Sequence, residues 1–240
     1  MANNYFQFKQ FTVYQDQCAM KVCTDACIQG AFTAQYLAGQ GRVVNTILDI
    51  GAGTGLLTLL LAQQLPAAIT AIELDAAAAA QARQNFAASP WAARLQVTEA
   101  DIRTLSPHNL YDHIITNPPF YEGSLKSGNA LRNQAMHATT LSYEALLQAV
   151  AAHLQPHGSF SVLLPYAAFP VFRQLAAGAG YYPQQLLEIK QSVRHGYFRT
   201  VGIFSRQPAA PVVSTLSIYD DKNMYTPAFS ALLRPYYLYL

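Results

Sequence analysis

The residues best suited to chemistry begin with a short glycine-rich segment in the first quarter of the chain. Three glycines alternate there with two small residues, Gly51, Ala52, Gly53, Thr54 and Gly55. The segment follows an apolar run, 46–50, and precedes a leucine-rich run, 56–65. Glycines at this place let the backbone turn sharply and let a ligand approach it closely. The spacing therefore predicts a nucleoside-binding loop between a strand and a helix.

Three acidic residues around this loop distinguish between possible ligands. Glu73 lies roughly 20 residues further on, where a carboxylate can accept both hydrogen bonds of a ribose diol. Asp49 lies inside the preceding strand and can reach an ammonium group, which a methionine moiety has and a pyrophosphate lacks. Asp101 follows the third expected strand and can accept from the amine of an adenine, or else cap the turn at Arg103. Together they favour S-adenosylmethionine over a dinucleotide, and we expect no metal.

A second motif, Asn117-Pro118-Pro119-Phe120, follows the fourth expected strand. The prolines stiffen the segment and remove two donors. The Asn117 side chain and the Pro118 carbonyl then remain as acceptors, and Phe120 offers an aromatic face. Two acceptors that hold both N–H groups of a delocalised amine free its lone pair for attack on a sulfonium methyl group. A rigid turn that merely ends a strand is the alternative, but the position after the fourth strand favours a catalytic role.

The elements that must position these motifs alternate along the chain. Seven strands are expected, at 46–50, 69–73, 95–98, 112–116, 159–164, 186–191 and 200–205. Helices are expected at 56–65, 76–88, 141–154 and 167–177. Strands separated by helices of this length imply right-handed crossovers. The pattern predicts an α/β fold with a Rossmann-like, doubly wound and mostly parallel sheet.

We interpret residues 1–240 as a single domain with a core and two short extensions. The N-terminal extension, 1–45, contains a possible β-hairpin marked by Phe6, Phe8, Phe11 and Val13, and a helix around 27–37. The core spans 46–206. The C-terminal extension, 207–240, offers one more strand at 214–219.

Composition narrows the class of protein. The chain is 52% hydrophobic and 12% charged, and its longest apolar stretch, 56–62, is too short to cross a bilayer. The N-terminal residues show no signal peptide pattern, so we expect a cytoplasmic protein. In that compartment Cys18, Cys23 and Cys27 are expected to be free thiols. Residues 1–120 carry six basic and eight acidic residues, and residues 121–240 carry nine and five. A mildly positive second half suits a polyanionic partner.

With these motifs assembled, the chain resembles the class I Rossmann-like methyltransferases that modify amino nitrogens and share an (Asn/Asp)-Pro-Pro-(Phe/Tyr) signature. More narrowly, it resembles the bacterial tRNA(Val) adenine-N6 methyltransferases. This narrower likeness rests on the stretches 8–13, 18–25 and 236–240, with Gly30-Ala31 following the second. Ala26 stands where that family usually has glycine, and Gln29 where it often has an apolar residue.

The resemblance implies an activity and further site residues. It implies methylation of the adenosine just 3′ of the anticodon, with S-adenosylmethionine as cofactor, the tRNA anticodon stem-loop as partner and catalysis at residues 117–120. It also implies that Lys21, Thr24 and Asp25 pack against the cofactor pocket. We expect a monomer. Basic residues that could contact RNA at the rim are Lys126, Arg132, Arg194, His195 and Arg199. His137 is more typical of a surface or capping histidine.

Other functions stay open at this point. A protein glutamine N5-methyltransferase uses the same tetrapeptide, because an amide nitrogen is also delocalised. A DNA adenine methyltransferase is a further possibility within the same chemistry. From another class, an NAD-dependent oxidoreductase or a catalytically silent nucleotide-binding module would have the glycine turn. Such proteins have no use for Asp49, Asp101 or the Asn-Pro-Pro-Phe segment.

Overall fold

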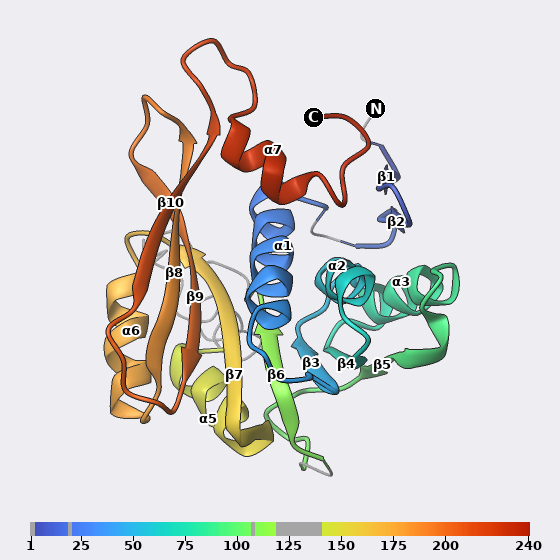
Figure 1. Ribbon diagram of the computed structural model, residues 1–240. Coiled ribbons are helices and arrows are strands. Elements are labelled where there is room, and N and C mark those ends of the chain that lie inside the picture. The colour runs from blue at the N-terminus through green and yellow to red at the C-terminus, as the bar shows by residue number, and fades with distance from the viewer. Residues whose placement is uncertain (1–2, 19–20, 107–108, 119–140) are drawn as a thin grey trace, which may run out of the picture.

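The computed structural model describes residues 3–18, 21–106, 109–118 and 141–240. Its main feature is an eight-stranded sheet in the order β10-β8-β9-β7-β6-β3-β4-β5 (Figure 1). In that order the strands are Val212–Tyr219, Tyr182–Ser192, Tyr197–Ser205, Leu154–Pro165, Tyr111–Thr116, Thr46–Ile50, Ala68–Glu73 and Leu95–Glu99. Only β9 runs antiparallel to its neighbours, β7 and β8. The expected doubly wound and mostly parallel sheet is therefore confirmed.

The expected number of strands, seven, is wrong. Strand β10 was expected in the C-terminal extension, and it joins the main sheet as an eighth strand parallel to β8. Its register runs from Val212 opposite Gln185 to Tyr219 opposite Ser192. The physical reason is that β10 pairs with the backbone groups that β8 would otherwise leave unpaired, and β10 then forms the edge of the sheet.

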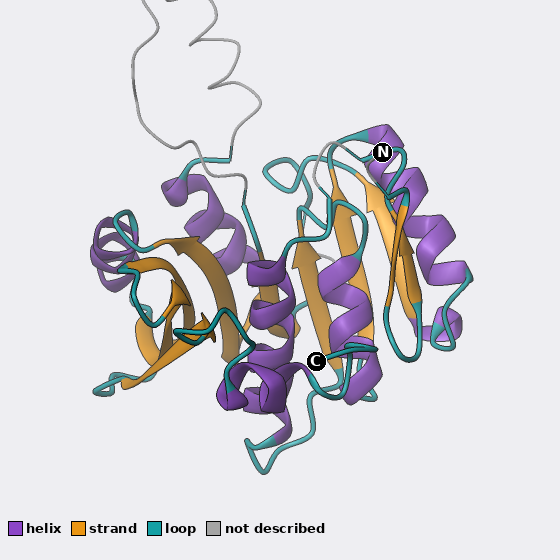
Figure 2. Ribbon diagram, turned by 90° about the horizontal axis from the view of Figure 1, so that it is seen from above, coloured by secondary structure: helices purple, strands orange, loops and turns teal. Residues whose placement is uncertain are grey.

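Helices cover both faces of the sheet (Figure 2). On one face lie α1 (Thr24–Ala38), α2 (Leu56–Gln64), α3 (Ala76–Ala87) and α7 (Pro227–Leu233). On the other lie α5 (Tyr143–His153) and α6 (Phe169–Gly178). A short 3-10 turn, η1 (Ala92–Arg94), precedes β5. Among the described residues, none of the helices has both the length and the apolarity needed to cross a membrane.

Local sequence explains where several helices begin. Asp75, Ser142 and Thr226 are the N-caps of α3, α5 and α7, and each side chain accepts a backbone N–H in the first turn. Such caps replace hydrogen bonds that a helix start otherwise lacks. Helix α2 has no side-chain cap and begins directly after Gly55. It is held instead by packing, because residues 56–62 are all buried.

The boundary between α5 and β7 differs most from the expectation. Residues 141–154 were expected to be helical and the next strand to begin at Ser159, but α5 ends at His153 and β7 begins at Leu154. Leu154 pairs with Tyr111 of β6, and the register shifts before the regular pairing starts at Ser159 opposite His113. Pairing with a neighbouring strand, which local sequence does not reveal, therefore determines this boundary.

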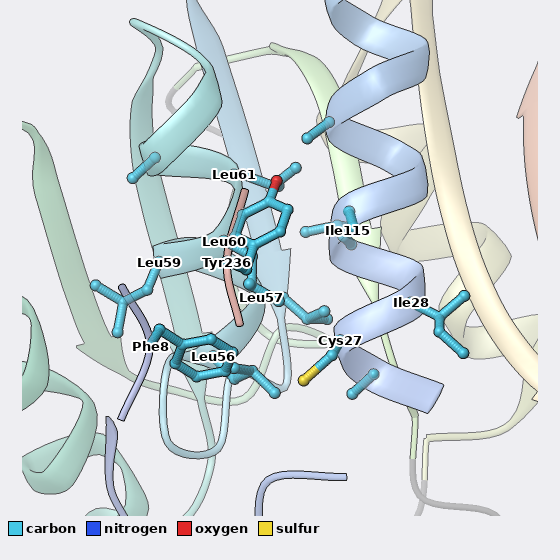
Figure 3. Close-up of a cluster of buried hydrophobic side chains, with 14 of the residues drawn as sticks. Phe8, Cys27, Ile28, Leu56, Leu57, Leu59, Leu60, Leu61, Ile115 and Tyr236 are labelled. Atoms are coloured by element: carbon cyan, nitrogen blue, oxygen red, sulfur yellow. The ribbon is translucent and has the colours of Figure 1, made fainter. Parts of the chain in front are cut away.

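The expected hairpin is confirmed as β1 (Tyr5–Gln7) and β2 (Thr12–Tyr14), with Phe6 opposite Val13. It lies beside the C-terminal residues, since Phe8 forms a bridge with Tyr237 and the Lys9 N–H donates to the Tyr236 carbonyl at 2.8 Å. Figure 3 shows Phe8 and Tyr236 among the buried side chains of α1 and α2. The two ends of the chain thus complete the hydrophobic core around α1 and α2.

The three cysteines are free, as expected. Cys27 is fully buried in the cluster of Figure 3, and burial raises the pKa of its thiol to about 12. Burial also raises the pKa of Cys23 to about 12 and that of Cys18 to about 11. Thiols that stay protonated at neutral pH are poor nucleophiles, so the raised pKa values disfavour a nucleophilic role for these cysteines.

Candidate functional site

The glycine loop joins β3 to α2 at the carboxyl end of the parallel strands. Gly51, Gly53 and Gly55 have φ angles of 74°, 55° and 81°, a left-handed conformation that other residues rarely adopt. A Cβ atom on Gly55 would lie 2.3 Å from the Phe86 ring of α3, whereas one on Gly51 or Gly53 would meet nothing within 4 Å. Gly55 is thus needed for packing as well as for conformation. Gly51 and Gly53 leave their side of the loop open.

Glu73 ends β4 beside this loop. Its Oε2 accepts the Gly53 N–H at 2.7 Å, and its Oε1 accepts the Asp75 N–H at 2.9 Å. An ionised carboxylate has about four acceptor sites, so two remain for a ligand. The loop is tied to the same strand, because the Gly51 N–H donates to the Ile72 carbonyl at 2.8 Å. Glu73 therefore orders the glycine loop and still presents acceptors at its open side.

Asp49 is fully buried at the end of β3. Its Oδ2 accepts from the Thr58 hydroxyl at 2.7 Å and from the Thr58 N–H at 3.2 Å. Its Oδ1 has no hydrogen-bond partner among the described residues. Burial raises the pKa of this carboxyl to about 7, partly opposed by the Thr58 bonds and reinforced by the charge of Glu73. A positively charged ligand group beside Oδ1 would stabilise the ionised form, as expected for an ammonium.

Asp101 lies just beyond β5, and the preceding Ala100 N–H donates to the Glu73 carbonyl at 2.9 Å. The side chain adopts the capping arrangement considered from the sequence, because its Oδ1 accepts the Arg103 N–H at 2.9 Å. It also forms an ion pair with the Arg103 guanidinium at 2.6 Å, which lowers the pKa of the carboxyl. A role for Asp101 toward adenine stays a prediction, and it would have to share this carboxylate with Arg103.

Asn117 and Pro118 follow β6, which lies next to β3 in the sheet. Thr116 pairs with Ile50, and its hydroxyl donates to the Ile50 carbonyl at 2.9 Å, so Asn117 lies beside the start of the glycine loop. The Asn117 Oδ1 is buried and has no partner within the described part of the chain. The structure therefore brings an unused acceptor next to the candidate cofactor loop. Pro119, Phe120, Lys126, Arg132 and His137 lie outside the described residues.

The residues implied by the resemblance, Lys21, Thr24 and Asp25, lie just before α1 and in its first turn. Lys21 is exposed and Thr24 is half-buried at the first position of α1. The Asp25 Oδ2 accepts from the Arg199 Nε at 3.0 Å, with both side chains largely buried. Arg199, expected at the rim, thus ties α1 to β9. Arg194 and His195 lie exposed in the turn between β8 and β9.

Sequence reasoning missed three polar residues that position this site. Asn85 of α3 donates from Nδ2 to the Thr54 carbonyl of the glycine loop and to the Tyr14 carbonyl of the hairpin, both at 2.9 Å. Gln29 of α1 donates to the carbonyl of Thr116 at 2.8 Å, and Thr58 binds Asp49. Each is a buried polar residue on a mostly apolar helix face, which is the signal that could have revealed it.

Comparisons with known proteins agree with this geometry. Residues 34–181 match the model of the methyltransferase small domain. A curated tRNA1(Val) (adenine(37)-N6)-methyltransferase from Bacteroides fragilis is 45% identical over 241 residues, which cover 99% of each chain. A protein of the same name from Cronobacter sakazakii is 38% identical, covering 100% of this chain and 97% of the relative.

Solved structures show the same fold at low sequence identity. A predicted O-methyltransferase from Agrobacterium tumefaciens superposes with a TM-score of 0.66 at 18% identity, covering 88% of this chain and 96% of that one. A glycopeptide N-methyltransferase in complex with S-adenosylmethionine superposes with a TM-score of 0.54 at 16% identity, covering 74% and 94%. The fold is therefore one on which methyltransferases are built.

Proposed function

The chain belongs to the family of tRNA1(Val) (adenine(37)-N6)-methyltransferases, and on this premise we propose that it methylates the N6 amino group of an adenosine in the anticodon loop of tRNA(Val). The observation that supports this most is the buried Oδ1 of Asn117 beside the glycine loop, which has no hydrogen-bond partner among the described residues. An acceptor in that place has a use only when a donor, such as an amino group, is brought to it.

Residues of the chain also fit the cofactor. The Asp49 Oδ1 is a buried acceptor without a partner among the described residues, and the Glu73 carboxylate faces the same loop. We propose that Asp49 holds the ammonium group, that Glu73 holds the ribose and that Asp101 holds the adenine amine. In this proposal residues 51–55 form the floor of the pocket, and Lys21, Thr24 and Asp25 border it.

The proposed chemistry depends on holding the target amine. When bound, S-adenosylmethionine supplies a methyl group activated by a positively charged sulfur. Asn117 accepts one N–H of the amine through Oδ1, and the Pro118 carbonyl accepts the other. This grip favours a pyramidal nitrogen whose lone pair points at the methyl group. In the same proposal Pro119 keeps the segment rigid and Phe120 stacks on the base, and the extra N–H proton leaves to water after transfer.

The anticodon stem-loop is the proposed partner, and a monomeric enzyme working in the cytoplasm is part of the same proposal. An unpaired loop base is the easiest to bring to a pocket edge, because no base pair has to be broken. The excess of basic residues in the second half of the chain supports contact with the stem. Activity should therefore fall as the salt concentration rises.

The test is radiolabelled methyl transfer to bulk tRNA, duplex DNA and a glutamine-containing protein fragment, followed by nucleoside analysis. We expect label in tRNA alone, recovered as N6-methyladenosine, with labelling about tenfold to a hundredfold slower in an Asn117→Ala control. Label on the protein fragment alone would identify a glutamine methyltransferase. Label on DNA alone would identify a DNA adenine methyltransferase.

A further inference from the structure

A second pocket lies between α6 and the strands β8 and β9, and the chemistry described above does not use it. Its volume is about 390 Å³, within the range of about 300–1,000 Å³ that is typical of small-molecule pockets. Phe169 and Leu186 give it apolar walls. Arg173 of α6, Glu188 of β8 and Thr200 of β9 add polar groups of three kinds.

The pocket lies at the same edge of the sheet as the candidate active site. Thr116 at the end of β6 pairs with Val162 of β7, and Leu164, two residues further on, pairs with Thr200 of β9. Strand β9 is thus two strands from β6, roughly 10 Å across the sheet. An RNA loop that delivers a base to Asn117 would therefore pass this pocket with a neighbouring nucleotide.

Two polar side chains on neighbouring strands line the pocket. Thr200 is 2% exposed, and its hydroxyl has no hydrogen-bond partner in the described residues. A buried hydroxyl without a partner is uncommon in proteins. Glu188 pairs with Thr200 across the strands, so both side chains lie on the same face of the sheet. No salt bridge to Glu188 is found in the described part of the chain.

Aromatic and basic side chains lead away from the pocket. The Tyr166 ring lines it, is 39% exposed, and lies 5.1 Å from the Tyr197 ring. The Lys190 ammonium lies 4.6 Å from the centre of the Tyr197 ring. Aromatic faces beside basic groups are typical of surfaces that bind single-stranded nucleic acid, because bases stack on the rings and phosphates contact the cations.

We propose that this pocket binds one unpaired RNA base that flanks the methylated adenosine. The Glu188 carboxylate accepts from the exocyclic amino group of that base, and the Thr200 hydroxyl bonds to the adjacent atom of its edge. Tyr166 contacts the ring, and Arg173 contacts a phosphate. The contact selects a base with an exocyclic amino group, so adenine, cytosine and guanine fit, and uracil, which offers only a ring N3–H, should bind less well. This inference rests on the proposed function, since it assumes an RNA substrate.

The test uses the complete enzyme and an anticodon stem-loop RNA whose loop nucleotides next to the target are replaced, one at a time, by uridine or an abasic residue. For the wild-type enzyme we expect one position at which either replacement raises KM by about fivefold to a hundredfold, the range for a lost base-edge contact. Glu188→Ala and Thr200→Val should raise KM for the unmodified RNA similarly. They should also lose most of the sensitivity to that replacement, with kcat and S-adenosylhomocysteine affinity unchanged.

Controls separate binding from folding. Arg173→Ala should raise KM for RNA, whereas Arg83→Ala, an exposed helix arginine on α3, should not. Thr200→Val removes a buried hydroxyl that has no hydrogen-bond partner among the described residues, so the melting temperature of this variant should not fall. Wild-type KM in both pocket variants, or undiminished sensitivity to the abasic residue, would overturn the inference. A wild-type enzyme that methylates no RNA would instead overturn the proposed function.

Discussion

The carboxylate of Asp49 is held from one side only, by Thr58. The hydroxyl and the N–H of Thr58 bind Oδ2 at 2.7 and 3.2 Å, while Oδ1 has no partner among the described residues. Thr58 lies in the first turns of α2, so the helix that follows the glycine loop fixes the orientation of an acid in the strand that precedes it. This arrangement leaves one oxygen ready for a cationic group and raises the pKa of the carboxyl to about 7.

The affinity for S-adenosylhomocysteine should therefore rise with pH through neutrality. Its ammonium favours the ionised form of Asp49, which is scarce at pH 6 and predominant at pH 8. Titration calorimetry at these two pH values should show a rise of roughly fivefold to tenfold. Asp49→Asn should bind weakly at both. 5′-Methylthioadenosine, which lacks the ammonium, is the matched control ligand and should show little pH dependence; an equal dependence for both ligands would contradict the assignment.

The stability of the ligand-free protein should depend on pH in the opposite sense. The pKa of Asp49 is raised on folding from 3.8 to about 7, so between these values the folded state holds a proton that the unfolded state has lost. The contribution of Asp49 to the free energy of unfolding is thus fully present below about pH 4 and is lost as the pH rises to about 7. The free energy of unfolding, measured with urea at several pH values across this interval, should fall less steeply with pH for Asp49→Asn than for the wild type. Parallel profiles would show that Asp49 titrates normally.

Glu73→Ala should weaken cofactor binding and loosen the glycine loop. Loss of two charge-assisted bonds to a ribose diol, each worth about 1.5–3 kcal/mol, implies at least a tenfold fall in affinity. The Gly53 and Asp75 N–H groups also lose their acceptor, so the melting temperature should drop. Glu73→Gln keeps one acceptor oxygen, so its cofactor affinity should lie between those of the wild type and Glu73→Ala. Unchanged affinity for S-adenosylhomocysteine in Glu73→Ala would place the ribose elsewhere.

Asn117→Ala should separate chemistry from cofactor binding. We expect kcat on tRNA to fall by about tenfold to a hundredfold, because the lost contact positions the amine in the transition state. Affinity for S-adenosylhomocysteine should change little. Asn117→Asp keeps an acceptor oxygen and should retain more activity than the alanine variant. Near-normal turnover of Asn117→Ala would reduce the residue to a structural turn.

Gly55→Ala should destabilise the fold more than Gly51→Ala. Both substitutions impose a left-handed conformation on alanine, which costs about 1–2 kcal/mol. Only at position 55 does the new methyl group also collide with Phe86, for a further 1–3 kcal/mol or so. Urea denaturation measures both. Replacing Phe86 by Leu in the Gly55→Ala background should recover part of the loss, and no recovery would show that the clash is relieved in another way.

The sequence by itself determined the features that depend on neighbouring residues. The alternation of apolar strands and helices predicted the doubly wound sheet, and the Gly-x-Gly-x-Gly segment predicted a sharp turn after β3, where the three glycines have positive φ angles. The order of the motifs along the chain then placed Glu73 and Asn117 at the same edge, because parallel strands present their carboxyl ends together. Local conformation and strand polarity are properties that a short stretch of sequence specifies.

The tertiary structure alone decided the partners of the polar side chains. Asp25 and Arg199 lie 174 positions apart, and their ion pair arises only because α1 crosses β9. Asn85 reaches the Thr54 carbonyl, and β10 becomes an eighth strand, for the same kind of reason. A single sequence does not specify which distant segments become neighbours, because many pairings bury similar apolar area. Packing of the whole chain selects among these pairings. It thereby also decides which acceptors have no partner among the described residues, such as the Oδ1 atoms of Asp49 and Asn117.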